Sequence, residues 1–261
     1  MRDLRVDQVT VRYGQGSRAV TVLDRVSLSI PTGSTLGLVG ESGSGKSTLA
    51  RAIVGLVPLA KGRVLLGDAP VAGRRGQPGP IQMVFQNPYA SLDPKLTVGA
   101  AIGEALPGRS AREVGEAVER YLDLLGLEPS HAGQYPHQLS GGQRQRVAIA
   151  RALAAEPEVL VADEITSALD VSVQAAILNL IGRLQKQLGL TLLFISHNIA
   201  AVRYLCDRIA VMHAGRIVET GPSEEITSMP AHAYTRTLLD AVPRIDAPSV
   251  PRPWATQTLE S

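Results

Sequence analysis

A glycine-rich segment near the N-terminus has the residue types needed to bind the phosphates of a nucleotide. Its residues are Gly40, Glu41, Ser42, Gly43, Ser44, Gly45, Lys46, Ser47 and Thr48, and they contain the pattern G-x-x-x-x-G-K-[ST]. Glycines let backbone N–H groups approach an anion, Lys46 adds positive charge, and the Ser47 hydroxyl can ligate Mg²⁺. The apolar run 34–39 and the helix-forming run 46–56 give it the strand–loop–helix context. We therefore predict nucleotide binding here; the alternative is a chance glycine-rich turn.

Two adjacent carboxylates, Asp163 and Glu164, follow the apolar run 159–162. Such a pair often marks only the solvated end of a strand. Beside a phosphate loop, however, Asp163 can hold Mg²⁺ through water and Glu164 can accept a proton from an attacking water. His197 follows the apolar run 191–195, so we expect it at the same sheet edge, where ligands bind in doubly wound sheets. A lone histidine in such a place is usually structural.

A second anion-binding pattern, without a lysine, occurs at Ser140, Gly141, Gly142 and Gln143. Ser140 is a good N-cap residue, and the two glycines would expose backbone N–H groups at a helix start. A simple helix cap has the same pattern. The functional alternative is that this segment serves a nucleotide held by another copy of the chain.

The elements expected around these residues define an α/β fold. Strands alternating with helices predict a phosphate-loop core with a mostly parallel, covered sheet. Alternating polarity at residues 26–30 predicts a half-buried antiparallel hairpin near the N-terminus. Residues from about 97 to 136 become helical, with a capping box at Ser110 and Glu113, and residues 143–154 are expected to form a further helix. Together they predict an inserted α-helical subdomain at about 97–155. Residues 67–80 are expected to be an exposed loop, and residues 244–261 a loose proline-rich tail.

Composition excludes several classes of protein. The 261 residues suit one domain with a subdomain, here 1–243. The chain has 26 basic and 24 acidic residues, a net charge of +2, which gives no argument for nucleic acid or an anionic membrane surface. A single cysteine, Cys206, excludes an internal disulfide and suits a reducing cytoplasm. We find no signal-peptide core and no membrane-spanning run, so membrane contact is expected through another protein.

These motifs together resemble the ABC transporter ATPases, and the resemblance covers residues 6–243. The motifs follow the order of that family: Tyr13 as the aromatic that stacks on adenine, Gly40 to Thr48 as Walker A, Gln86 as the Q-loop glutamine, Leu139 to Gln143 as the signature, Asp163 and Glu164 as Walker B, Ser167 to Asp170 as the D-loop, and His197 as the switch histidine.

The resemblance implies that the N-terminal hairpin belongs to an antiparallel β-subdomain. It also implies a sandwich in which two ATP molecules are clamped between Walker A of one subunit and Ser140 to Gln143 of the other, with Asp170 as a further nucleotide-binding residue. Catalysis would use Glu164, His197, Lys46 and Gln86, and Mg²⁺ would be held by Ser47, Gln86 and Asp163. ATP would close the dimer and hydrolysis would open it. The Q-loop and the helical subdomain would contact a transmembrane permease.

Within the family, the segments 84–94 and 232–239 look like the branch that imports oligopeptides, dipeptides or nickel chelates, with a C-terminal extension at about 222–243. The chain departs from that pattern at three positions. Ala233 and Ile165 stand where proline is usual, and Asn198 stands where aspartate is common. None of the three removes a phosphate or metal contact, so ATP use is still expected.

The resemblance also implies the partners and the location. We expect transmembrane permease subunits, a second ATPase subunit that is identical or related, a solute-binding protein, and a peripheral position at the cytoplasmic face of the membrane, with no nucleic acid. One alternative is a non-transport ABC ATPase of DNA repair or translation, although no coiled coil, zinc site or second cassette is visible. The other is a nucleotide-binding regulator without turnover. The solute itself is not encoded in these motifs.

Overall fold

The computed structural model describes residues 2–14, 16–71, 78–87, 91–167 and 169–241. The chain divides into two compact units, one formed by residues 1–72 and 181–261 and the other by residues 73–180. Three features expected from the sequence lie wholly or partly outside the described residues: the tail at 244–261, residues 88–90 after the Q-loop glutamine, and Ala168 of the D-loop.

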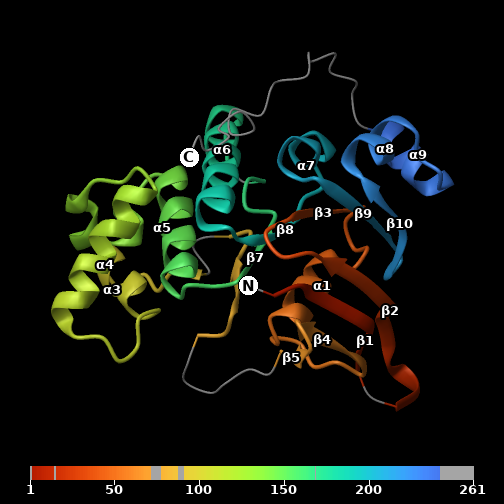
Figure 1. The fold of residues 1–261 in the computed structure, drawn as a ribbon, viewed down its shortest axis with the longest axis horizontal. Coiled ribbons are helices and arrows are strands. Elements are labelled where there is room, and N and C mark those ends of the chain that lie inside the picture. The colour runs from red at the N-terminus through yellow and green to blue at the C-terminus, as the bar shows by residue number, and fades with distance from the viewer. Residues whose placement is uncertain (1, 15, 72–77, 88–90, 168, 242–261) are drawn as a thin grey trace, which may run out of the picture. The chain divides into compact units, whose positions relative to one another are not determined.

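The first unit contains an antiparallel sheet in the order β2-β1-β4-β5, which confirms the predicted N-terminal β-subdomain (Figure 1). Its strands are β1 (Leu4–Tyr13), β2 (Val20–Ile30), β4 (Lys61–Leu66) and β5 (Ala69–Pro70), with a 3-10 turn, η1 (Gly16–Arg18), before β2. The prediction of a loop throughout 67–80 is wrong at β5. Pro70 pairs with Leu65 at the sheet edge, where a residue without an N–H group is tolerated.

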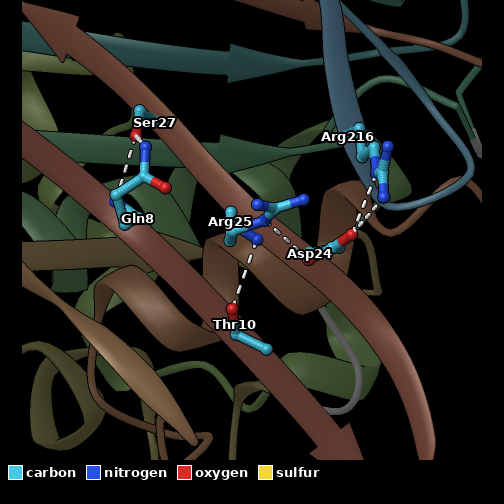
Figure 2. Close-up of polar contacts among 6 residues, drawn as sticks. All are labelled: Gln8, Thr10, Asp24, Arg25, Ser27 and Arg216. Atoms are coloured by element: carbon cyan, nitrogen blue, oxygen red, sulfur yellow. Dashed lines mark hydrogen bonds and ion pairs between the residues drawn. The ribbon is translucent and has the colours of Figure 1, made fainter.

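Two non-glycine residues in the described strands of this sheet have positive φ angles, Gln8 and Arg25, each at 49°. Both lie near irregularities of the β1–β2 register, where an extra residue leaves backbone groups without a ladder partner. Side-chain hydroxyls replace the missing partners, as Figure 2 shows: Ser27 Oγ accepts from Gln8 N at 3.0 Å, and Thr10 Oγ1 accepts from Arg25 N at 3.2 Å. The bulges are therefore satisfied features of the sheet.

An ion pair joins β2 to the C-terminal hairpin of the same unit. Arg216 Nε donates to Asp24 Oδ2 at 3.0 Å (Figure 2), and Gly215 O accepts from Asp24 N at 2.9 Å. The hydrogen bond from Arg216 holds the pKa of Asp24 below its usual value, although burial opposes this shift.

The first unit also contains parallel strands. Strand β3 (Thr35–Val39) pairs in parallel with β8 (Thr191–Ile195) and β9 (Arg208–His213), and β10 (Arg216–Pro222) returns antiparallel to β9. Every residue of β3 and β8 is buried, as expected for parallel strands with covered faces. Helix α1 (Lys46–Ile53) follows β3. It ends three residues before the predicted position, because Gly55 has a left-handed φ of 79°.

Helix α7 (Ile199–Leu205) packs closely on β3. A Cβ atom on Gly37 of β3 would lie 2.1 Å from Val202 Cγ1 and 3.3 Å from the sulfur of Cys206, which is fully buried. Asn198 caps this helix, since its Oδ1 accepts from Ala201 N at 3.2 Å. The departure from aspartate at this position therefore keeps a working helix cap.

The first unit ends with α8 (Ser223–Ser228) and α9 (Ala233–Asp240), near β10 (Figure 1). His232 is the N-cap of α9 and Ala233 is its first helical residue. Proline favours that position because its φ angle is already helical and no N–H group is needed there. Alanine is a strong helix former, so the helix begins at the same place without the proline.

The second unit combines two parallel strands with helices (Figure 1). Strand β6 (Ile81–Val84) pairs with β7 (Val159–Asp163). The helices are α3 (Val98–Gly103), α4 (Ala111–Leu124), α5 (Gly141–Ala154) and the part of α6 (Val171–Leu188) up to Leu180, with two 3-10 turns, η2 (Pro129–Gly133) and η3 (Pro136–Gln138). Helices α3, α4 and α5 contact one another, which confirms the inserted helical subdomain; its exact limits, about 97–155, stay a prediction.

Helix α4 begins as predicted. Ser110 and Glu113 form a capping box, with Ser110 N donating to Glu113 Oε2 at 2.8 Å. The hydrogen bonds from Ser110 lower the pKa of Glu113. Val118, Tyr121 and Leu122 are buried, so the apolar stripe of this helix is its packed face. None of the helices in the described part of the chain combines the length and the apolar character needed to cross a membrane.

Gly115 offers a direct test of this helix. It is exposed in the interior of α4, and a Cβ atom there would meet nothing within 4 Å. We expect Gly115→Ala to raise the free energy of unfolding by about 0.5–1 kcal/mol, because alanine loses less backbone entropy in a helix. Urea denaturation checks this result. The matched variant Gly103→Ala should lower stability, since its Cβ would lie 2.9 Å from Val114 Cγ1; equal effects at both positions would contradict the packing described.

Candidate active site

The phosphate-loop lysine is buried and is held by the loop itself. Lys46 is 5% exposed, and its Nζ donates to Gly40 O at 2.9 Å and to Glu41 O at 2.8 Å. Lys46 is also the first residue of α1, so its ammonium group lies beside the N-terminus of that helix. Positive charge and helix N–H groups together make this loop suited to an anion.

Two glycines allow the loop to adopt this shape. A Cβ atom on Gly40, which has a φ of 156°, would lie 2.2 Å from the backbone oxygen of Met212. Gly45 has a φ of 106° and acts as the N-cap of α1 without a side chain. No other residue type fits the first position without moving backbone atoms, which is the physical reason for the glycine pattern.

The interior of the loop contains a polar atom that suits a phosphate. Within the described residues, the buried hydroxyl of Ser44 has no hydrogen-bond partner, and a buried polar group without a partner is costly. Glu41, Ser42 and Gly43 are exposed, whereas Ser47 and Thr48 are half-buried in the first turn of α1. An anion with several oxygens therefore fits the residues present here.

The first unit also carries the predicted adenine-stacking and switch residues. Tyr13 is the last residue of β1 and is 45% exposed, which leaves ring surface available for stacking. His197 is exposed and lies just beyond the carboxyl end of β8, where it was expected. Strands β3 and β8 are parallel neighbours, so the phosphate loop and His197 follow the same ends of adjacent strands.

The second unit brings Gln86 and Glu164 together. Gln86 Nε2 donates to Glu164 Oε2 at 3.0 Å and lies 3.3 Å from Ser167 Oγ. Asp163 is the last residue of β7 and is 4% exposed, whereas Glu164 is half-buried with a positive φ of 49°. This unusual backbone angle for a glutamate turns the chain sharply at the strand end. The two adjacent carboxylates therefore lie in different environments.

The signature segment forms a capping box at the start of α5. Ser140 Oγ accepts from Gln143 N at 3.3 Å, and Gln143 Oε1 accepts from Ser140 N at 2.8 Å. The helix starts at Gly141, two residues earlier than the sequence pattern indicated, because Ser140 caps it. The expected helix cap is therefore present, and the use of this segment by a nucleotide of another copy stays a prediction.

The two signature glycines lie close to the residues around the D-loop. A Cβ atom on Gly142 would lie 2.8 Å from Val173 Cγ1, and one on Gly141 would lie 3.5 Å from Leu169 Cδ2. Asp170 is exposed and its carbonyl accepts from Gln174 N at 2.8 Å at the start of α6. The structure thus brings the signature and the D-loop side by side within one unit.

Two contacting residues were not found from the sequence. His131 Nε2 lies 3.0 Å from Gln143 Nε2, while its Nδ1 lies 3.0 Å from Glu128 O. Tyr234 Oη accepts from Glu41 N of the phosphate loop at 3.0 Å. No spacing rule points to His131. Tyr234 belongs to the segment 232–239, which looks like the peptide- or nickel-importing branch of the family. That resemblance was the one feature of the sequence that could have drawn attention to Tyr234.

A phosphate loop between a buried strand and a helix, a capped signature segment, and a carboxylate pair after a second strand define an ATP-binding cassette. The family model described as ABC transporter matches residues 23–167. The chain therefore belongs to the ABC transporter ATP-binding family, and it is an ATP-binding and hydrolysing subunit. A second model, described as oligopeptide/dipeptide transporter, C-terminal region, matches residues 218–259.

Relatives cover most of the chain. A putative peptide import ATP-binding protein of Brucella abortus is 50% identical over 240 residues, which are 88% of this chain and 72% of the relative. The oligopeptide transport ATP-binding protein OppF of Bacillus subtilis is 47% identical over 237 residues, 87% of this chain and 78% of OppF.

Solved structures agree with the fold. A dimeric ATP-binding cassette in a post-hydrolysis state bound to ADP and Pi has a TM-score of 0.74 at 30% identity, over 84% of this chain and 98% of that one. The cassette cbiO1 of Clostridium perfringens, part of an ABC transporter complex, has a TM-score of 0.74 at 30% identity. The match covers 85% of this chain and 89% of cbiO1.

Proposed function

We propose that the chain is the ATPase subunit of an importer of oligopeptides or dipeptides, and that it drives transport through separate membrane-spanning permease subunits. The observation that carries this proposal is the match of residues 218–259 to the C-terminal region of oligopeptide and dipeptide transporters. The names of the relatives in Brucella abortus and Bacillus subtilis support the same solute class. A solute-binding protein outside the membrane would deliver the peptide.

The roles of the phosphate-loop residues follow from their chemistry. Residues 40–48 would bind the phosphates of ATP, mainly through backbone N–H groups other than that of Glu41, which donates to Tyr234 Oη. Lys46 would leave its present carbonyl partners to bind the outer phosphates. Tyr13 would stack on the adenine ring. His197 would hold the γ-phosphate and the attacking water.

The residues available for Mg²⁺ are the Ser47 hydroxyl, the Gln86 side chain and the Asp163 carboxylate. All three offer oxygen atoms, which Mg²⁺ prefers, and a single carboxylate suits an ion that also binds phosphate and water. When bound, Mg²⁺ would neutralise charge on the phosphates.

Glu164 would act as the general base. Its carboxylate already accepts a hydrogen bond from Gln86, which fixes the direction of one oxygen. Proton acceptance from the attacking water requires a positioned carboxylate within hydrogen-bond reach. Gln86 would therefore link the base to the metal, and its loop would report the state of the nucleotide to the permease.

Ser140, Gly141, Gly142, Gln143 and Asp170 would bind the ATP held by a second ATPase subunit, identical or related. The N–H groups of the capped helix start give the dipole and the donors for a phosphate. The dimeric cassette found among the structural relatives supports this arrangement. The subunit would lie at the cytoplasmic face of the membrane, bound to its permease, and would not bind nucleic acid.

Uptake measurements test the proposal. Cells that lack this chain should lose uptake of a radiolabelled tripeptide and a radiolabelled dipeptide, and should regain it with the wild-type chain but not with Glu164→Gln. Labelled nickel is measured in parallel. Loss of nickel uptake with normal peptide uptake would replace peptide by nickel as the solute, and normal uptake of both, with the chain recovered on ribosomes or DNA, would refute transport.

A further inference from the structure

The C-terminal helix α9 contacts the phosphate loop directly. Tyr234 lies in the first turn of this helix, and its hydroxyl oxygen accepts a hydrogen bond from Glu41 N at 3.0 Å. The two residues are 193 positions apart in the sequence but belong to the same compact unit. A residue of the C-terminal region is therefore in contact with the second residue of the nucleotide-binding motif.

The contact restrains the peptide group whose carbonyl oxygen accepts a hydrogen bond from Lys46. The N–H group of Glu41 and the carbonyl of Gly40 belong to one planar peptide group, so fixing one fixes the other. Tyr234 holds the N–H side, while Lys46 Nζ donates to the carbonyl side at 2.9 Å. This peptide group is thus restrained from both sides, and its orientation sets where the Lys46 ammonium group lies.

The Tyr234 ring is itself held by the strand next to the loop. Its centroid lies 3.9 Å from that of the His213 ring, with a tilt of 35°. His213 ends β9 and follows Met212, whose backbone oxygen occupies the space beside Gly40. In the turn after β9, Gly215 N donates to Ser44 O at 3.0 Å. The hairpin that orients Tyr234 therefore also supports the middle of the loop.

A carboxylate on β10 fixes the start of α9. Glu219 accepts hydrogen bonds from Ala231 N at 2.8 Å and His232 N at 3.1 Å, and His232 Nδ1 accepts from Tyr234 N at 3.1 Å. Burial opposes ionisation of Glu219, but the nearby Thr235 side chain and the hydrogen bonds from these two backbone groups outweigh it and lower its pKa. Glu219 is therefore ionised at neutral pH and keeps Tyr234 in place.

We infer that Tyr234 is a positioning residue of the phosphate loop and that it couples the C-terminal helix to nucleotide binding. The hydroxyl restrains the Gly40–Glu41 peptide before nucleotide arrives, so less entropy is lost on binding. Because coupling is reciprocal, bound nucleotide stabilises α9 to the same extent that α9 favours nucleotide.

The first test is Tyr234→Phe in the purified full chain. This change keeps the ring on His213 and removes only the hydrogen-bond acceptor. We expect the Kd for ADP, measured by titration calorimetry, and the KM for ATP to rise about two- to tenfold, which corresponds to the loss of one hydrogen bond. We expect kcat to stay within twofold, because the hydroxyl does not touch the reacting atoms.

The matched control is Thr237→Ala on the same helix. The Thr237 hydroxyl donates to Ala233 O, one turn back, with no other side-chain partner among the described residues, and the residue is exposed. This variant should bind ADP like the wild-type chain. A rise in Kd equal to that of Tyr234→Phe would show that general weakening of α9, and not the contact with Glu41, controls affinity, and would overturn the inference.

Hydrogen exchange provides the reciprocal measurement. In the wild-type chain, saturating ADP should slow amide exchange in residues 233–240, and in Tyr234→Phe this protection should be largely lost while protection of the phosphate loop remains. Equal protection of α9 in both proteins, together with an unchanged Kd for ADP, would refute the coupling. The affinity measurement and the exchange measurement both require that the wild-type chain binds ADP. This binding does not depend on which solute is transported.

Discussion

Replacement of Glu164 with glutamine is expected to lower the ATP turnover rate by about a hundredfold or more while ATP still binds. An amide cannot accept the proton of the attacking water, and loss of a general base typically costs about 10²–10⁴ in rate. Glutamine has the same shape, and its oxygen can still accept the hydrogen bond that Gln86 donates at 3.0 Å. Phosphate release measures the turnover. Size-exclusion chromatography with ATP should detect a dimer that the hydrolysing wild-type chain does not accumulate.

Glu156→Gln is the matched control for this experiment. Glu156 belongs to the same unit and has nearly the same backbone angle, with a φ of 50°. Its carboxylate is exposed and accepts from Arg109 at 2.8 Å. This variant should hydrolyse ATP at the wild-type rate. If Glu164→Gln also kept the wild-type rate, the role of Glu164 as the base would be refuted.

The second large effect is expected for Gly40→Ala, which should lower the affinity for ADP on the order of a hundredfold, since the displaced loop would lose one or two hydrogen bonds to charged phosphate oxygens, each about 1.5–3 kcal/mol. The added Cβ would lie 2.2 Å from the backbone oxygen of Met212 and 2.9 Å from Ser44 Oγ, at a φ of 156°. Backbone atoms cannot yield as a flexible side chain can, so the loop must move. Titration calorimetry with ADP measures the loss.

Circular dichroism and a thermal melt establish that Gly40→Ala is folded, and Gly115→Ala serves as the comparison variant. It also adds a methyl group to a glycine, but at a helix position where nothing lies within 4 Å. Its affinity for ADP should be unchanged. Wild-type affinity in a folded Gly40→Ala protein would mean that the loop does not need the conformation described here.

The positions of the candidate site residues along the fold were more predictable than their contacts. The phosphate loop, the carboxylate pair and His197 could be placed because each follows an apolar run that forms a buried strand. Their functional roles stay predictions. The contact of Tyr234 with Glu41 could not be placed, because it depends on how α9 packs 193 residues later in the chain. The contact of His131 with Gln143 depends on the path of the loop before α5, so the spacing of residues in the sequence does not predict it either.

Element boundaries were less predictable than element types, for local physical reasons. Helix α5 begins at Gly141 because its N-cap, Ser140, overrides the low helix propensity of two glycines. Strand β5 was missed because a proline next to glycine-rich sequence usually marks a loop, whereas here Pro70 lies at an edge that needs no N–H donor. In both cases a specific hydrogen-bond arrangement decided the outcome against the average preference of the residue.

The single cysteine gives this chain an internal reporter. Cys206 is fully buried at the end of α7, close to β3 of the nucleotide-binding unit. A thiol reagent can therefore modify the folded chain only after this region opens, and the modification rate measures how often it does so. The wild-type chain, without added dyes or labels, can thus reveal whether nucleotide makes the neighbourhood of β3 open less often.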